Sequence, residues 1–421
     1  MISTTHDPGW MIDPMRWPDV AVARGSAPRA EIARLLFGAA VASLPIRVGL
    51  PAGRRLGAGR TGAPLMMIRN PGAFFTRLGA GGLIGFGESY MAGDWDCADL
   101  TGLLTVFAAH VGDLVPTPFQ RLRTMAVRRK PAADEQTKTG ARRNIGRHYD
   151  LSNEFFALFL DQTMTYSSAL FETTADGWPA AAGPLLEQAQ QRKIDRLLDE
   201  ARVGPGSRLL EVGTGWGELA IQAGRRGAID RTVTISARQH ELAARRVAEA
   251  GLADRVSVEL RDYRDVSGDY DAICSVEMIE AVGDRYWDTY FGKLDQLLAP
   301  GGRVALQSIT MAHDRMMASR RTYTWILKYI FPGGLIPSVT AVEDSLRRRT
   351  GLRVAERFDF GPHYADTLQI WRDRFDARRD EVGTLDFDDV FIRMWQFYLC
   401  YAEAGFRSGY LNVSQLTLER A

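Results

Sequence analysis

Cysteine is scarce in this chain. Its 421 residues include only Cys97, Cys274 and Cys400, which lie far apart in the sequence and match no metal-ligand spacing. Structural zinc sites need closely spaced cysteines or histidines, and small secreted domains that depend on disulfides are rich in cysteine. We therefore expect reduced thiols in a cytoplasmic protein, and no metal site.

The sequence also has no excess of charge of one sign. Lys and Arg number 52 and Asp and Glu number 51, which gives a formal net charge of +1. Proteins that bind nucleic acid through their overall field are strongly basic. Nucleic acid is therefore not the expected partner.

Long hydrophobic runs are absent as well. A helix that crosses a bilayer needs about 20 consecutive apolar residues, and no such run occurs. Residues 1–18 carry His6, Asp7, Asp13 and Pro14 and contain no apolar core of the kind found in secretory signals. If the substrate is a membrane lipid, we expect a peripheral protein that reaches it from the cytoplasmic, inner surface of the membrane.

The length of the chain and the distribution of its turn residues predict two domains. Residues 1–30 are rich in proline, glycine and polar residues, and we expect a flexible arm there. Residues 31–129 alternate apolar runs with glycine-rich turns, which predicts a small mixed N-terminal accessory domain. The polar residues 130–142 lack apolar periodicity and predict a linker, and residues 143–421 are expected to form the larger domain.

The larger domain alternates short apolar runs with segments of helical periodicity. The expected strands are Arg208–Val212, Thr232–Ile235, Val256–Leu260, Asp271–Val276 and Arg303–Ile309. The expected helices include Ala237–Ala250 and Tyr286–Leu298, and the second is followed by the stop signal Pro300-Gly301-Gly302. Strands separated by helices imply right-handed crossovers and a parallel sheet. The predicted fold class is therefore α/β and Rossmann-like.

A glycine-rich loop follows the first of these strands, with the sequence Glu211-Val-Gly213-Thr-Gly215-Trp-Gly217. Glycines at alternate positions let the backbone turn sharply and approach a ligand closely. The N-terminus of the next helix offers free N–H groups to a carboxylate, and Glu211 can accept from a cationic amino group. The methionine half of S-adenosylmethionine, a zwitterion, suits both. The spacing differs from the G-x-G-x-x-G pattern of dinucleotide sites, and a tight structural turn is the alternative.

Two further segments lie where such folds place the nucleoside. Asp262 and Tyr263 follow the third expected strand, where an acid and an aromatic ring border the adenine. The end of the second strand has no acidic residue to bind the ribose diol. Thr234, Ser236 and Gln239 would supply those hydrogen bonds instead.

Several ordered motifs surround this loop. They are Arg147-His148-Tyr149-Asp150-Leu151-Ser152-Asn153, Thr165-Tyr166-Ser167-Ser168, Asp262-Tyr263-Arg264-Asp265, Ser275-Val276-Glu277-Met278-Ile279-Glu280, Lys328-Tyr329-Ile330-Phe331-Pro332-Gly333-Gly334 and Phe406-Arg407. Together they strongly resemble the cyclopropane-fatty-acid synthase and mycolic-acid methyltransferase family, from about Arg143 to the C-terminus. The resemblance implies a class I S-adenosylmethionine-dependent methyltransferase fold.

The resemblance also implies roles for individual residues at the cofactor. Tyr166 and Ser167 would contact its amino acid end, above Gly213, Gly215 and Gly217. The remaining residues implied to bind the cofactor are Thr234, Ser236 and Gln239 at the ribose, Asp262 and Tyr263 at the adenine, and Glu211 at the amino group.

A bound bicarbonate acts as the base in the cyclopropane synthases, held by Cys, Glu, His, a backbone group of Ile, and Tyr. The matching positions here are Ser168, Glu280, Gln307, Ile309 and Tyr364. Serine and glutamine in place of cysteine and histidine still form hydrogen bonds. A bicarbonate site is therefore compatible with the sequence, while its affinity and position stay open.

Within the family, the resemblance is closest to actinobacterial enzymes of tuberculostearic acid synthesis, which methylate an oleoyl chain of phospholipid to a 10-methylene product. Residues 84–95 also resemble the accessory domain of the longer members. A homodimer is implied by the family alone. Reduction to a methyl branch would need a separate reductase, because the chain has no nicotinamide or flavin motif.

Methylation of an alkene leaves a carbocation, so the site has to orient the alkene, exclude water and remove a proton. Glu280, aided by Tyr364, is the candidate base. Aromatic faces stabilise cations, and the candidate tunnel walls are Tyr323, Trp325, Tyr329, Phe331, Trp371, Trp395, Phe397 and Tyr398. The basic and apolar segment 121–130 is a candidate for membrane contact.

Three alternatives stay open. Ring closure at the same double bond would make the protein a cyclopropane-fatty-acyl-phospholipid synthase. A compact polar pocket would indicate a small-molecule O- or N-methyltransferase. Loss of the base through the changes at Ser168 and Gln307 would leave a catalytically impaired subunit that binds cofactor and lipid.

Overall fold

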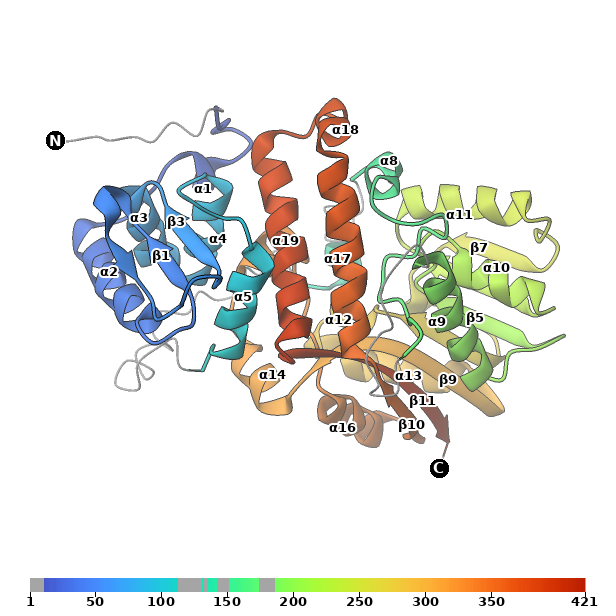
Figure 1. Ribbon diagram of the computed structural model, residues 1–421. Coiled ribbons are helices and arrows are strands. Elements are labelled where there is room, and N and C mark those ends of the chain that lie inside the picture. The colour runs from blue at the N-terminus through green and yellow to red at the C-terminus, as the bar shows by residue number, and fades with distance from the viewer. Residues whose placement is uncertain (1–10, 113–130, 132–134, 142–150, 174–185, 421) are drawn as a thin grey trace. The chain divides into compact units, whose positions relative to one another are not determined.

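The computed structural model describes residues 11–112, 131, 135–141, 151–173 and 186–420 (Figure 1). The chain packs as two compact units, each built from segments that are far apart in the sequence. The first unit comprises Met1–Arg129, Thr322–Ile330 and Arg372–Tyr410, and the second comprises Lys130–Arg321, Phe331–Trp371 and Leu411–Ala421. The predicted domain bounds stay predictions.

The first unit contains a four-stranded sheet in the order β2-β1-β3-β4. Its strands are β1 (Arg47–Gly49), β2 (Arg55–Leu56), β3 (Leu65–Ile68) and β4 (Trp95–Cys97). Its helices are α1 (Pro18–Ala21), α2 (Ala27–Val41), α3 (Pro71–Gly81), α4 (Leu83–Met91), α5 (Leu100–Ala109), α15 (Trp325–Tyr329), α18 (Arg379–Thr384) and α19 (Asp389–Arg407). Phe74, Trp95 and Trp395 are fully buried in this unit.

The segment 1–30, where we expected a flexible arm, contains α1 and the beginning of α2. Val20 on α1 is fully buried. Arg77 of α3 donates to the Val20 carbonyl at 2.7 Å and also pairs with Asp94 at 3.0 Å. Buried charge needs such partners, so these contacts hold α1 against the unit.

The second unit is built on a seven-stranded sheet in the order β10-β11-β9-β8-β5-β6-β7. Its strands are β5 (Arg208–Val212), β6 (Ile229–Thr234), β7 (Val256–Leu260), β8 (Tyr270–Val276), β9 (Leu298–Met311), β10 (Leu352–Asp359) and β11 (Leu411–Arg420). The strands β5 to β9 pair in parallel, which confirms the predicted Rossmann-like sheet. The antiparallel strands β10 and β11 were not predicted.

Helices cover both faces of this sheet. Neighbouring residues of a strand point to opposite faces, so they pack against different helices. Leu209 packs with residues of α9 and α10, whereas Leu210 packs with residues of α13 and α16. The helices are α8 (Asn153–Ala157), α9 (Leu186–Glu200), α10 (Glu218–Arg225), α11 (Ala237–Glu249), α12 (Ile279–Val282), α13 (Trp287–Leu297), α14 (His313–Ser319), α16 (Val339–Arg349) and α17 (Gly361–Ala377). Residues 372–377 at the end of α17 belong to the first unit.

The predicted beginnings of two strands were wrong. We expected the second strand to begin at Thr232, but β6 begins at Ile229. We expected β9 to begin at Arg303, after a stop at Pro300-Gly301-Gly302, but the strand begins at Leu298. Tyr270 pairs with Leu298 and Ala272 with Arg303, so the turn residues form an irregularity within the strand. The segment 121–130 and the motif residues 147–150 lie outside the described residues. Within the described part of the chain, no helix is long and apolar enough to cross a membrane.

Candidate active site

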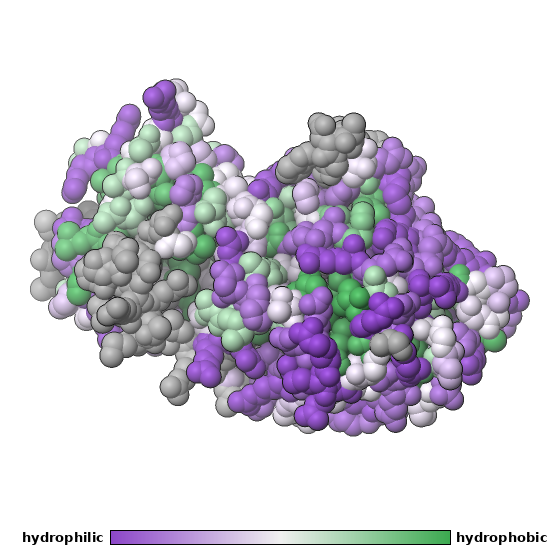
Figure 2. Space-filling view, turned by 90° about the horizontal axis from the view of Figure 1, so that it is seen from below, coloured by the Kyte–Doolittle hydropathy of each residue, from purple (hydrophilic) through white to green (hydrophobic). Residues whose placement is uncertain are grey.

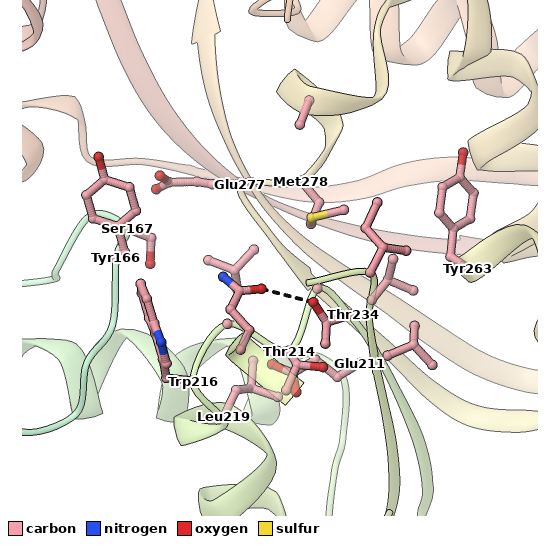
Figure 3. A pocket seen from close by; sticks show the side chains of 18 of the residues that line it. Tyr166, Ser167, Glu211, Thr214, Trp216, Leu219, Thr234, Tyr263, Glu277 and Met278 are labelled. Carbon is pink, nitrogen blue, oxygen red and sulfur yellow. Dashed lines mark hydrogen bonds between the residues drawn. The ribbon is translucent and has the colours of Figure 1, made fainter. Parts of the chain in front are cut away.

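A pocket opens beside the glycine loop, at the carboxyl ends of β5, β6 and β8 (Figure 3). Open α/β sheets bind ligands at this edge. Gly213, Gly215 and Gly217 all have positive φ, at 99°, 52° and 92°. A Cβ on Gly213 would lie 2.5 Å from Cγ of Met278, whereas one on Gly215 would meet open space. Gly217 caps α10 and is not part of the pocket wall.

Tyr166 and Ser167 line one end of the pocket, as Figure 3 shows. The Tyr166 ring stacks on Trp371 with centroids 5.2 Å apart. Lys193 of α9 donates to Oγ of Ser167 at 2.7 Å. Burial lowers the pKa of Lys193 to about 8, so this ammonium group remains mostly protonated at neutral pH and brings a positive charge to the pocket.

Glu211 lies at the end of β5 and lines the floor of the pocket. Its Oε2 accepts from the Thr232 hydroxyl at 2.5 Å. Burial and the nearby carboxylate of Asp230 raise the pKa of Glu211 well above its usual value. A cationic ligand group beside Glu211 would favour its ionised form.

The residues predicted at the ribose lie at the end of β6 and the beginning of α11. The Thr234 hydroxyl donates to Oε1 of Gln239 at 2.9 Å, and both side chains line the pocket (Figure 3). Ser236 caps α11 by accepting from the Gln239 N–H at 3.3 Å, and it is not part of the pocket wall. The Ser236 side chain therefore contacts the backbone of Gln239 instead of lining the pocket in this structure.

Tyr263 lies toward the opposite end of the pocket from Tyr166 (Figure 3), and its neighbour Asp262 also lines the pocket. Both carboxylate oxygens of Asp262 accept from Arg264, at 2.7 and 2.8 Å. Burial by itself would raise the pKa of Asp262, but the hydrogen bonds and charge of Arg264 hold it below its usual range. The Tyr263 ring packs edge-to-face on Tyr290 at 5.4 Å.

The pocket contains residues to which the sequence analysis assigned no role. Lys193, Gln136, Met278 and Glu277 all line it. Lys193 sits on the buried face of α9, and a lysine at an apolar helix position would have been the signal. Gln136 lies in the predicted linker, where its buried Nε2 donates to the Pro332 carbonyl at 3.0 Å; no sequence pattern indicates this.

Three of the five residues predicted to hold bicarbonate converge on Glu277. Tyr364 of α17 donates to Oε2 at 2.9 Å. The Ser168 N–H and Nε2 of Gln307 donate to Oε1 at 3.0 and 2.9 Å. The hydroxyl of Ser168 instead donates to the Ala169 carbonyl at 3.1 Å.

The other two predicted residues, Glu280 and Ile309, form a hydrogen bond with each other. Oε1 of Glu280 accepts from the Ile309 N–H at 2.5 Å and from the Ser308 hydroxyl at 2.9 Å. Oε2 of Glu280 is buried and has no hydrogen-bond partner among the described residues. Burial and the neighbouring charge of Glu277 raise the pKa of Glu280 to about 8. Glu280 is therefore mostly a neutral acid at pH 7.

The predicted aromatic residues divide between the two units. In the second unit, Trp371 packs against Tyr166, Phe159 and Tyr364, with centroids 5.2, 6.2 and 6.0 Å away. Phe331 also belongs to this unit. The first unit contains Tyr323, Trp325, Tyr329, Trp395, Phe397 and Tyr398. An aromatic cluster around Trp371 therefore adjoins the Tyr166 end of the pocket.

A glycine-floored pocket at the strand ends of a seven-stranded sheet whose β11 runs antiparallel to its neighbours defines the class I S-adenosylmethionine-dependent methyltransferases. Within that class, the chain belongs to the mycolic acid cyclopropane synthetase family, whose model matches residues 136–416. This confirms the family predicted from the motifs.

Two curated relatives extend the match into the N-terminal region. The chain is 53% identical to the tuberculostearic acid methyltransferase of Mycobacterium tuberculosis over 422 aligned positions, which cover 100% of this chain and 99% of the relative. It is 34% identical to the cyclopropane-fatty-acyl-phospholipid synthase of Escherichia coli K12, over 84% of this chain and 87% of the relative.

Solved structures agree on the fold. Mycolic acid cyclopropane synthase CmaA1, in complex with SAH and CTAB, superposes with a TM-score of 0.59 and 30% identity, over 69% of this chain and 99% of that one. Coclaurine N-methyltransferase superposes with a TM-score of 0.55 at 17% identity. The second likeness shows the fold alone.

Proposed function

We propose that this enzyme transfers the methyl group of S-adenosylmethionine to the double bond of an unsaturated fatty acyl chain, in an oleoyl phospholipid, and releases a 10-methylene product. The observation that carries the proposal is the 53% identity, over essentially the whole of both chains, to a tuberculostearic acid methyltransferase. The pocket beside the glycine loop supports the proposal, because this activity requires a site for the cofactor.

The donor set of the pocket fits S-adenosylmethionine. Its two ends differ in chemistry, with Ser167 and Lys193 at one end and Tyr263 at the other (Figure 3). Lys193 would face the methionine carboxylate and Glu211 the ammonium group, while Thr234 and Gln239 would bind the ribose hydroxyls. When bound, the cofactor supplies an electrophilic methyl group.

The chain has to hold the alkene in line with that methyl group and keep water away from the developing cation. The cluster of Tyr166, Trp371 and Tyr364 presents ring faces and edges beside the pocket. Ring faces attract cations by about 0.5–2 kcal/mol, more where water is excluded. We assign the stabilisation of the substrate cation to these rings.

The set of residues predicted to hold bicarbonate does not fit an added anion. The donors Tyr364, Ser168 N–H and Gln307 already face Glu277, and the Ile309 N–H faces Glu280. A further negative charge beside Glu277 would be repelled. We therefore assign no step to bicarbonate.

The proposed partners follow from the same function. Contact with the inner membrane surface is supported by α2, where Ile32 and Leu35 are more than half exposed and Arg29 is also exposed, while Arg34 pairs with Glu31. Basic and apolar side chains together suit anionic headgroups. One face of the molecule shows apolar side chains among hydrophilic ones (Figure 2). A homodimer and a separate reductase stay predictions.

Incubation of the purified protein with dioleoyl phospholipid and methyl-labelled cofactor tests the proposal. We expect label in the acyl chain, and mass spectrometry with NMR should detect an exocyclic methylene group. A cyclopropane ring at the same position would identify a cyclopropane synthase instead. Label in a small polar acceptor and none in lipid would contradict the proposal.

A further inference from the structure

Glu277 has an unusual backbone conformation. It is the first residue after β8, and its φ is +51°, in the left-handed region. That region costs a residue with a side chain about 1–2 kcal/mol, and glycine much less. Strained positions of this kind cluster at functional sites. A buried carboxylate at such a position therefore calls for an explanation other than stability.

The Glu277 carboxylate is held on both oxygens. It accepts from the Ser168 N–H, from Nε2 of Gln307 and from the Tyr364 hydroxyl, all between 2.9 and 3.0 Å. All three groups donate, as an ionised carboxylate requires. The side chain lies at the Tyr166 end of the pocket, so it borders the space for the reacting groups (Figure 3).

A chain of hydrogen bonds fixes the direction of the Gln307 amide. Arg196 donates to Oε1 of Gln415 at 2.8 Å, so Nε2 of Gln415 is left to donate to Oε1 of Gln307 at 3.1 Å. Gln307 must then present its Nε2 to Glu277. An arginine cannot act as acceptor, and therefore the orientation of both amides is determined.

Glu277 and Glu280 share one buried region but differ in what surrounds them. Burial raises the pKa of both groups. Three donors and the charge of Lys193 offset part of this rise at Glu277, whose pKa stays above its usual value, whereas Glu280 has fewer donors, also feels the charge of Glu277 and has a pKa of about 8. Two carboxylates in one site divide into an acid and a base. Both oxygens of Glu277 face donors, whereas Oε2 of Glu280 has no partner among the described residues, so we assign the negative charge to Glu277 and the proton to Glu280.

We propose that Glu277 is the proton acceptor of the methyl transfer, a base built into the chain in place of the bicarbonate that the resemblance to the cyclopropane synthases implies. This inference rests on the proposed function. It also places Gln307, Ser168 and Tyr364 as residues that position the base, and Glu280 as its neutral neighbour.

The step balances as follows. The alkene electron pair forms a bond to the methyl carbon, the sulfur–carbon bond breaks, and the sulfonium becomes a neutral thioether. A hydride shift moves the cation to the carbon that bears the new methyl group. Glu277 then takes a proton from that methyl group, and the released pair of electrons forms the exocyclic double bond. The carboxylate becomes a carboxylic acid, which returns the proton to solvent.

The test compares Glu277→Gln, Glu277→Gly and the exposed control Glu356→Gln with the wild-type chain, in carbon-dioxide-free buffer and with added bicarbonate or formate. Turnover is measured on dioleoyl phospholipid, cofactor affinity by calorimetry, and anion binding by carbon-13 NMR of labelled bicarbonate. Loss of a general base costs about 10²–10⁴-fold. We expect a loss of this size in both Glu277 variants, with unchanged cofactor affinity, and none in the control.

Glu277→Gly leaves the three donors facing an empty space, so added bicarbonate should bind there and restore part of the activity. Glu277→Gln fills that space and should not respond. Wild-type turnover should be independent of bicarbonate. The proposal is overturned if Glu277→Gln keeps wild-type turnover, or if this variant weakens cofactor binding by the same factor as it slows turnover. It is also overturned if the wild-type protein needs added bicarbonate. A wild-type protein that methylates no lipid would contradict the proposed function, whereas losses confined to the variants concern Glu277 alone.

Discussion

The hydroxyl of Tyr364 lies 2.9 Å from Oε2 of Glu277. This hydrogen bond connects the first turns of α17 with the end of β8, although 87 positions separate the two residues. The family resemblance had already given Tyr364 a role at the base. Glu277 lies in one of the motifs that carry the resemblance, but we had assigned it no role. The predictions below start from this relationship.

Tyr364→Phe should shift the pH dependence of turnover. The variant removes one donor to the Glu277 carboxylate, which raises the pKa of that group. A hydrogen bond to a charged group contributes about 1.5–3 kcal/mol, which corresponds to about 1–2 pH units. Because the base must be ionised, the acidic limb of the kcat profile should move to higher pH. Tyr401→Phe in the first unit is the control, and an unmoved limb in Tyr364→Phe would remove this tyrosine from the positioning set.

The free energy of unfolding should fall as the pH rises toward 8. The folded pKa of Glu280 is about 8, above the value of about 4.3 in an unfolded chain. The folded state therefore binds more protons between these values, and its stability is lost as the pH rises through the folded pKa. The contribution between pH 6 and pH 8 is about 2 kcal/mol.

Urea unfolding of the wild-type chain and Glu280→Gln across this range measures the effect. The glutamine variant should show a flatter dependence on pH. Asp230, buried with a pKa raised to about 8, contributes with the same sign, so Asp230→Asn should also flatten it. A wild-type stability that rises steadily from pH 6 to pH 8 would contradict both assignments.

Gln239→Leu should weaken the binding of the cofactor. The Gln239 amide lies in the pocket wall and is oriented by the Thr234 hydroxyl at 2.9 Å. Loss of one hydrogen bond to the ligand costs about 1 kcal/mol, or about fivefold to tenfold in Kd. Calorimetry with S-adenosylmethionine measures it. Glu241→Gln, exposed on the same helix, should leave the Kd unchanged; equal affinities in both variants would place Gln239 outside the ribose site.

Gly213→Ala should destabilise the protein and reduce cofactor binding. The new Cβ would lie 2.5 Å from Cγ of Met278, and the φ of +99° is unfavourable for alanine. Overpacking of this kind costs about 1–3 kcal/mol. Gly292→Ala is the matched control, because that glycine lies in α13 with open space at its Cβ position, and it should stabilise the protein by up to about 1 kcal/mol. Adding Met278→Ala to Gly213→Ala should recover part of the loss if the clash is its cause.

Local patterns in the sequence were sufficient to predict that the parallel strands of the sheet exist. The strands β5, β7 and β8 lie within one residue of the predicted bounds, because apolar runs and flanking turn residues determine such strands locally. The glycine loop and the segments around Thr234 and Asp262 were found for the same reason. Parallel strands bring their carboxyl ends to one edge, so these segments could be placed around one pocket.

Other features depended on contacts between distant segments. The antiparallel pairing of β10 with β11 joins residues about 60 positions apart, and no local pattern specifies it. The Gln136 side chain is buried although the surrounding residues are polar. Local periodicity contains no information about such contacts.

The sequence by itself determined the family, the sheet that carries the cofactor pocket and nine of the residues that line the pocket. Only the tertiary structure decided which carboxylate meets Tyr364, Ser168 and Gln307, and which one keeps its proton. The reason is physical: the charge state of Glu277 and Glu280 depends on burial and on donors contributed by β9, α17 and the segment before α9, and these come together only when the chain has folded.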